Sequence, residues 1–304
     1  MISRKVLNAW MPWCAGAAAA ATLAVGSASA EIGVVIQDPD SSSSPRPYIF
    51  GVIVDDPNPF GNIWTRFAPN GATRVVLNPE GSVNGDGRPE LLVHPETGLP
   101  IAVWSRRSHA GYEIVISRFE SGEWTAPQAL SGGSTPAFDP AIAVDPADGS
   151  VHVAYWEDGS SRRVLHRSAP ADLGSWSAET VVSQAGEFAA RPSAVFHDGT
   201  LRIAYEVHTF GFGETPRNIV LARREGAGFV PEVLAVTHFA GVVRPEIHSH
   251  NGRVWVDWVD SDGELGWTRR VGAGTWETLR YEPYGDATDR EFDARARVRA
   301  QAIR

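Results

Sequence analysis

Short apolar runs of strand length recur along this chain at a nearly constant spacing. Each recurrence opens on a polar residue followed by proline, and spacings of 51, 52 and 53 residues separate Pro89, Pro140, Pro192 and Pro245. A hairpin turn rich in Asp, Asn and Gly follows each run, and a second run then leads to Trp104, Tyr155, Tyr205 or Trp258. Two further runs complete each recurrence. Four strands in about fifty residues predict an all-β propeller of four-stranded antiparallel blades.

A shorter, diverged copy of the pattern begins at Arg46-Pro47, where Trp64-Thr65-Arg66 matches Trp267-Thr268-Arg269. We therefore predict five blades within residues 31–284, starting near residues 46, 88, 139, 191 and 244. Residues 285–304 form a separate C-terminal segment. Strict alternation from Phe292 to Ala302 favours a strand that closes the ring, whereas its Ala and Arg content also suits a helix.

The first thirty residues have the order of a secretory signal peptide. Arg4 and Lys5 precede a short apolar stretch, and Ala28-Ser29-Ala30 offers the small residues that a signal peptidase accepts. We expect cleavage after Ala30 and a secreted or periplasmic location. No later apolar run is long enough to cross a bilayer, so we expect no transmembrane anchor.

Removing residues 1–30 also changes the chemistry that the chain offers. The only Cys, the only Lys and both Met lie in that segment, as Cys14, Lys5, Met1 and Met11. The remainder therefore excludes disulfides, thiolate metal sites, cysteine nucleophiles and lysine Schiff bases. Its charge is −11, from 25 basic and 36 acidic residues, because segment 1–30 holds two of the 27 basic and none of the 36 acidic residues. Such a charge argues against nucleic acid as a partner.

Four motifs follow one another within residues 140–177: Pro-x-Ile-Ala-Val-Asp, Gly-x-Val-His-Val-Ala-Tyr-Trp, Val-Leu-His-Arg-Ser and Gly-x-Trp-Ser. This order resembles the sialidase/BNR-repeat propeller superfamily, and the likeness of repeat type covers most of residues 85–280. The family's Asp-box turn is echoed at 172–176, one residue short. The resemblance implies a propeller that hosts a hydrolase, a lyase, a lectin or a scaffold. A true sialidase would add an arginine triad, an acidic proton donor and a tyrosine nucleophile supported by glutamate.

The residues that open the repeats are expected to converge at one mouth of the propeller channel: Arg46, Arg88, Asp139, Arg191 and Arg244. Glu90 and Glu246 lie two residues after an arginine and share its side of the strand. Arginine binds carboxylates with its planar fork, so this ring predicts an anionic ligand, and salt bridges between blades are the alternative. Asp139 and Glu246 are also candidate catalytic carboxylates.

The aromatic residues divide into two groups. Tyr155 and Tyr205 are candidate nucleophiles, but they match the repeat's aromatic position, which favours packing between blades. Trp156 and Trp255 fall outside that position, so they are candidates for a platform on which a sugar ring stacks.

Two metal sites are possible from the residue types. Residues 82–91 resemble the calcium loop of FG-GAP repeats, which would make Asn84, Asp86 and Glu90 ligands of Ca²⁺, although Ser82 replaces the first aspartate and a plain turn is the alternative. His248 and His250 share one strand face and would need a third ligand. The turn position held by Asp145 in one repeat is His94, His197 or His250 in the others, which predicts a turn-capping role.

These features favour a secreted or periplasmic module that binds a glycan or another extracellular or envelope ligand without a complete catalytic set. A carbohydrate-active enzyme, either a sialidase-like glycoside hydrolase or a polysaccharide lyase, is the first alternative. A scaffold for a protein partner is the second.

Overall fold

The computed structural model describes residues 32–33, 48–55, 62–68, 73–76, 87–108, 111–208, 217–237, 245–250, 252–259, 264–272, 275–277 and 280–283. Among these residues, no helix has the length and apolar character needed to span a membrane. The predicted signal peptide, the segment 285–304 and four candidate site residues lie outside the described residues: Arg46, Asn84, Asp86 and Arg244.

The described strands form five antiparallel sheets. The first contains β1 (Ile32–Gly33), β2 (Tyr48–Asp55), β3 (Asn62–Ala68) and β4 (Thr73–Val76). The second contains β5 (Gly87–Val93), β6 (Pro100–Ser108), β7 (Gly111–Glu120) and β8 (Glu123–Trp124), with β9 (Gln128–Ala129) also paired to β7. The third contains β10 (Ala137–Val144), β11 (Val151–Asp158), β12 (Arg162–Ala169) and β13 (Thr180–Val181).

The fourth sheet contains β14 (Phe188–His197), β15 (Thr200–His208), β16 (Arg217–Glu225) and β17 (Gly228–Thr237). The fifth contains β18 (Glu246–His250), β19 (Arg253–Val259), β20 (Glu264–Gly272) and β21 (Thr275–Trp276), with β22 (Arg280–Pro283) also paired to β20. Four-stranded antiparallel sheets in chain order are the blades of a β-propeller, which confirms the predicted fold.

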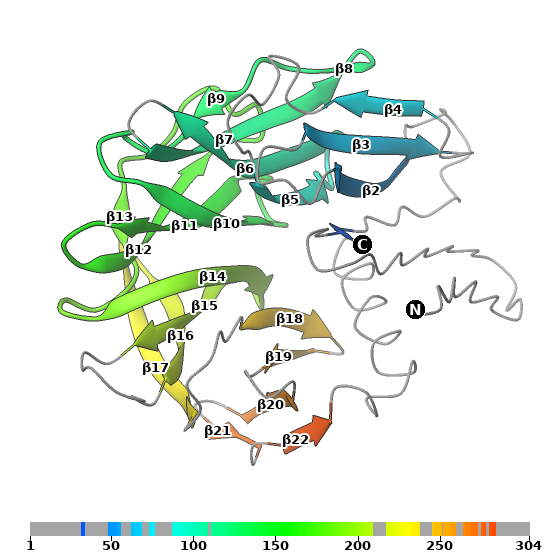
Figure 1. Cartoon of the computed structure of the whole chain (residues 1–304). Helices are drawn as coiled ribbons and strands as arrows, with labels where there is room; N and C mark the ends of the chain where they lie inside the picture. Colours follow the sequence, from blue (N-terminus) through cyan, green and yellow to red (C-terminus); the bar gives the residue numbers. More distant parts are fainter. Residues whose placement is uncertain are drawn as a thin grey trace, which may run out of the picture.

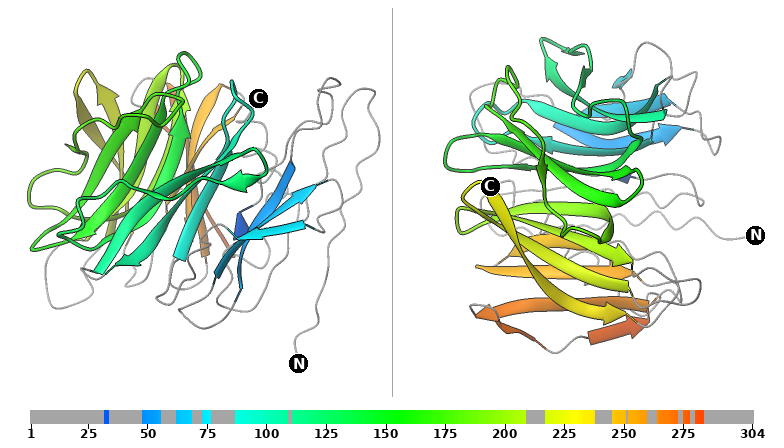
Figure 2. Two further views of the ribbon diagram at one scale, coloured as in Figure 1. Left: turned by 90° about the horizontal axis from the view of Figure 1, so that it is seen from above. Right: turned by 90° about the vertical axis from the view of Figure 1, so that its left-hand side faces the viewer.

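The sheets follow one another around an arc and stack as successive layers (Figures 1 and 2). Their first strands touch one another in sequence, β5 with β10, β10 with β14 and β14 with β18, so these strands lie innermost. The run after Arg46-Pro47 forms β2, which lies second in its sheet, between β1 and β3. The first sheet thus extends to the N-terminal side of the predicted blade start.

Both faces of the middle sheets are covered by neighbouring sheets. Residues 151–157 of β11 and 201–207 of β15 are buried without interruption, so these strands lack the alternation of a sheet with one wet face. The aromatic residues of the second strands are the largest buried side chains: Trp104, Tyr155, Tyr205 and Trp258. Tyr155 packs among residues of β6 and β7, in the preceding sheet. Tyr205 and Trp258 likewise pack with residues of the sheet before their own, so the aromatic position holds adjacent sheets together in the third, fourth and fifth sheets.

The turn after the innermost strand also links neighbouring sheets. His94 Nδ1 accepts hydrogen bonds from the backbone N–H groups of Glu96 and Thr97, at 3.2 and 3.3 Å. Its Nε2 lies 2.6 Å from the carbonyl oxygen of Gly149, in the equivalent turn of the next sheet. These contacts confirm the turn-capping role predicted for His94.

A histidine pair is buried between the third and fourth sheets. His152 Nδ1 lies 2.9 Å from His166 Nε2, and the two rings pack edge-on against Phe196 and Phe229. Burial lowers the pKa of His152 to about 4 and that of His166 to about 3, and the Arg224 guanidinium also acts against protonation of both rings. Asp145 and Asp148 partly offset this effect at His152.

We expect the free energy of unfolding to fall on acidification through this pair. Below the ordinary histidine pKa of 6.5 the unfolded chain binds protons that the native pair resists, so stability declines from about pH 6.5 toward pH 4. In the variant His166→Gln, the side chain at position 166 is an amide that stays neutral at every pH. Urea unfolding at pH 7.0 and pH 5.0 should show a smaller loss of stability for the variant than for the wild type. Equal losses in both proteins would contradict this role of the pair.

A glycine of β20 is required by the packing of the fifth sheet. Gly266 lies directly opposite Trp258, and a Cβ atom at Gly266 would overlap the indole ring. We expect Gly266→Ala to destabilise the protein by about 1–3 kcal/mol, the usual cost of overpacking a core. Gly228→Ala is the matched control, because Gly228 also lies in a strand and has no atom within 4 Å of the added methyl group. Thermal unfolding should lower Tm for the first variant only; equal Tm changes would refute the packing argument.

Candidate functional site

The innermost strands are interrupted at the residues that open the repeats. The register shifts between Gly87 and Glu90, between Phe138 and Ala141 and between Ala190 and Ser193. Each shift contains the repeat's proline, which has no N–H to donate to the strand ladder and is tolerated at a bulge. In the second, third and fourth sheets, the sequence pattern that marks the repeat is therefore a β-bulge on the innermost strand.

Two of these bulges hold charged residues in left-handed backbone conformation. The φ angle is 46° at Asp139 and 52° at Arg191. Side chains other than glycine adopt this conformation at a cost of about 1–2 kcal/mol, and aspartate and asparagine tolerate it better than most. Bulges of this kind re-aim side chains, so both residues point in directions that a regular strand would not allow.

The two bulges are joined by a polar network, which we call the bulge network: Asp139, Trp156, Arg191, Glu206 and His208. Arg191 Nη1 donates to Glu206 Oε1 at 2.7 Å, and Arg191 Nε lies 4.0 Å from Asp139 Oδ2. Asp139 Oδ2 accepts the indole N–H of Trp156 at 2.8 Å. His208 Nε2 lies 2.9 Å from Glu206 Oε1. The network therefore joins the first two strands of the third sheet to the first two strands of the fourth.

The residues of this network differ in burial, so that one buried residue supports others that are partly exposed. The Glu206 side chain is 1% exposed, whereas the side chains of Arg191 and Asp139 are 22% and 12% exposed. Glu206 thus holds the guanidinium of Arg191 from the buried side. The structure brings together Asp139 and Arg191 across two sheets, a contact that the predicted ring and the alternative of salt bridges between blades both allow. The wider ring stays a prediction, because Arg46 and Arg244 lie outside the described residues. Glu206, which sequence reasoning did not single out, also belongs to the network.

The two candidate stacking residues have arginine over one ring face. The guanidinium of Arg162 lies 5.1 Å from the ring centre of Trp156, and Phe138 packs 4.9 Å from the same ring. Trp255 has Arg269 at 5.0 Å and Trp267 at 5.5 Å. A sugar would stack on either ring only at a face that these neighbours leave open, and the stacking role stays a prediction.

Tyr155 and Tyr205 are fully buried, and each hydroxyl points to a glutamate. The Tyr155 hydroxyl donates to Glu179 at 2.7 Å and the Tyr205 hydroxyl to Glu187 at 3.3 Å. Burial first, and then the neighbouring glutamate, raise the pKa of both phenols well above the ordinary value. Both effects oppose formation of a phenolate nucleophile, so the geometry favours packing for these residues.

Glu90 links two sheets rather than standing apart as a free ligand. Its Oε2 accepts the backbone N–H of Ile142 at 3.2 Å, and Ser193 Oγ accepts the N–H of Ile247 in the same way at 3.2 Å. In both cases the side chain of the residue after the repeat's proline accepts a backbone N–H of the innermost strand in the next sheet. The calcium role of Glu90 stays a prediction, because Asn84 and Asp86 lie outside the described residues.

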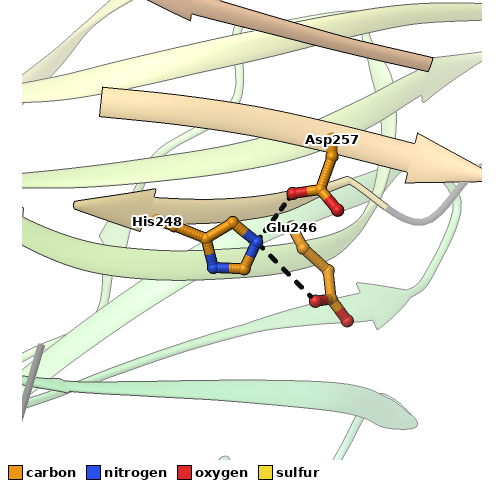
Figure 3. A group of neighbouring side chains, drawn as sticks. All are labelled: Glu246, His248 and Asp257. Atoms are coloured by element: carbon orange, nitrogen blue, oxygen red, sulfur yellow. Dashed lines mark ion pairs between the residues drawn. The ribbon is translucent and has the colours of Figure 1, made fainter. Parts of the chain in front are cut away.

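A second polar group lies on the fifth sheet, and we call it the His248 cluster: Glu246, His248 and Asp257 (Figure 3). Glu246 and His248 are two residues apart on β18, and Asp257 lies directly opposite Glu246 on β19. The His248 Nε2 atom is 2.6 Å from Asp257 Oδ1 and 4.0 Å from Glu246 Oε2. Sequence reasoning singled out Glu246 and His248 but missed Asp257, whose position holds Val103, Ala154 or Ala204 in the other sheets.

Comparison with models of protein families and with curated proteins finds no match. Among solved structures, the chain is similar to the lectin BP39L from Burkholderia pseudomallei, with 14% identity, a TM-score of 0.56 and coverage of 76% of this chain and 65% of the lectin. It is similar to a PL25 ulvan lyase, with 12% identity, a TM-score of 0.55 and coverage of 77% and 62%.

The chain is also similar to the Hadza microbial sialidase Hz136, with 13% identity and a TM-score of 0.51. That match covers 72% of this chain but only 55% of the sialidase, so the chain spans little more than half of that protein. At these identities the likenesses show a fold. The described sheets and these neighbours agree that the chain has a β-propeller fold.

Proposed function

We propose that this protein binds a glycan through the bulge network. The observation that carries the proposal is the left-handed backbone of Asp139 and Arg191 at equivalent bulges of adjacent sheets. Charged residues held in a costly backbone conformation cluster at functional sites, where the surrounding structure fixes them in place. Here Glu206 and Trp156 supply that fixation.

The chemistry of the bulge network suits sugar hydroxyl groups. Each hydroxyl donates one hydrogen bond and accepts others, so a ring of hydroxyls matches a site that mixes carboxylates with a guanidinium. Asp139 offers acceptors and Arg191 offers donors, and both keep part of the side chain exposed. A few convergent polar groups of this kind set ligand orientation in small-molecule sites.

The structural neighbours support a carbohydrate ligand. One is a lectin, one is a sialidase, and a PL25 ulvan lyase has been solved with a saccharide bound to it. We expect the present protein to meet its glycan outside the cytoplasm, once the predicted signal peptide has been removed.

A carbohydrate-active enzyme is the second candidate, and the His248 cluster favours it. Asp257 lies close enough to orient the imidazole of His248, and Glu246 is a second carboxylate on the same face. A positioned histidine with carboxylates is a common arrangement for general acid–base catalysis.

Glycan binding should depend on Arg191 and Glu206. We expect the double variant Arg191→Gly/Glu206→Gln to lose binding on a glycan array by at least about tenfold, the effect of losing one charged hydrogen bond. Glycine relaxes the left-handed backbone at position 191, and glutamine avoids a buried carboxylate that has lost its guanidinium partner, so the variant should keep the Tm of the wild type within a few degrees.

The matched control is Arg223→Gly/Glu225→Gln, which removes an exposed ion pair of β16 in the same sheet. This control should bind glycans as the wild type does. Absence of binding by the wild-type protein, or equal binding by all three proteins, would refute the proposal. Turnover of a bound glycan that is lost in Glu246→Gln with binding retained would establish the enzyme instead.

A further inference from the structure

The fifth sheet departs from the other sheets at two buried positions. The position of His248 holds Leu92, Ala143 or Val195 in the equivalent strands, and that of Asp257 holds Val103, Ala154 or Ala204. Apolar residues therefore satisfy the packing of these positions in the second, third and fourth sheets. His248 and Asp257 are only 7% and 9% exposed, so the fifth sheet buries polar groups where the fold does not need them. Such departures from a local packing rule are expected at functional sites.

The geometry directs all three side chains to one point. Figure 3 shows one nitrogen of the His248 ring facing both carboxylates. This atom, Nε2, makes no hydrogen bond of normal geometry, although it is 2.6 Å from Asp257 Oδ1 and 4.0 Å from Glu246 Oε2. One ligand atom from each of the three residues lies within 4.8 Å of the others.

The charges of the cluster suit a divalent cation. Glu246 and Asp257 are directly opposite each other across two antiparallel strands, a position in which like charges repel. A cation between the two carboxylates lowers that repulsion, and a neutral imidazole supplies a further lone pair to it.

We infer that Glu246, His248 and Asp257 bind a divalent transition-metal ion, for which Zn²⁺ is the best match. One imidazole nitrogen with two carboxylate oxygens is a donor set that zinc accepts, and the imidazole makes the set unsuited to Ca²⁺. Tetrahedral bonds of about 2.0–2.1 Å place ligand atoms about 3.4 Å apart. That spacing lies between the 2.6 Å and 4.0 Å separations from His248 Nε2 in the structure, so small side-chain movements suffice.

Three protein ligands leave a fourth tetrahedral position for water or a ligand, as in zinc sites that act on substrates. Two of the three ligands, Glu246 and His248, lie on β18, the innermost strand of its sheet. The metal site does not depend on the glycan proposal, since the bulge network belongs to the third and fourth sheets.

Titration of the full chain with ZnCl₂, after removal of metals with EDTA, tests the site by calorimetry. We expect one equivalent of Zn²⁺ to bind, with Kd at or below about 1 μM, and to raise the Tm because the ion binds the native state. The variants His248→Val and Asp257→Ala install residues that other sheets carry at these positions, so both should fold. Each should weaken Zn²⁺ binding by about 100-fold, through loss of one of three ligands.

Asp198→Asn is the matched control, because Asp198 Oδ2 lies 3.0 Å from His197 Nε2 in an exposed turn without a third ligand in the described residues. This variant should bind Zn²⁺ as the wild type does. Co²⁺ in place of Zn²⁺ should give the visible absorption of a tetrahedral site, and His248→Val should abolish it. No Zn²⁺ binding by the wild type, binding that survives both cluster variants, or preference for Ca²⁺ over Zn²⁺ would overturn the inference.

Discussion

The fold depends on the burial of both faces of each small sheet. A four-stranded sheet with two apolar faces cannot be stable in water by itself, so each sheet needs a neighbour on either side. The unbroken burial of residues 151–157 and 201–207 shows this requirement in the second strands. In the third, fourth and fifth sheets the aromatic residue of the second strand packs toward the preceding sheet, as Tyr205 does against residues of β10 and β11. The repeat pattern in the sequence is a consequence of this packing.

Packing between the faces of the sheets does not provide hydrogen-bond partners for the backbone at their inner edges. An innermost strand is paired on one side only, and its other backbone N–H groups need acceptors. Glu90 supplies one for Ile142, and Ser193 supplies one for Ile247, each across a boundary between sheets. The bulges at the repeat prolines occur on these same strands. The inner edge therefore combines polar groups, irregular backbone and side chains that face away from the core. At this edge, substitutions can change the function of a propeller without loss of stability.

Features that repeat along the chain could be predicted from the sequence, whereas features that depend on contacts between sheets could not. Apolar runs, hairpin turns and the aromatic column repeat along the chain, so the blades and the role of His94 were predictable. The two-residue strand β1 has no such signal, and the order of the first sheet was missed. Likewise, nothing in one sequence indicates that Arg162 covers Trp156 or that Glu206 holds Arg191, because these pairs depend on the strand register and bulges. Asp257 was missed for the same reason, because only the strand register places it opposite Glu246.

Repeats in one chain provide an internal comparison that a single structure otherwise lacks. Glu90 and Glu246 hold equivalent positions, yet Glu90 binds the backbone of the next sheet and Glu246 lies beside a histidine and an aspartate. The residue type at a repeat position thus says little about its role. The same holds for arginine: lysine is absent after residue 30, so an arginine at a blade start reflects composition as much as selection. What distinguishes Arg191 is its left-handed backbone and its buried partner, and what distinguishes His248 is a position that packing alone fills with an apolar side chain. Functional residues of this propeller are therefore best sought at equivalent backbone positions where one repeat carries a side chain of different chemistry from the others.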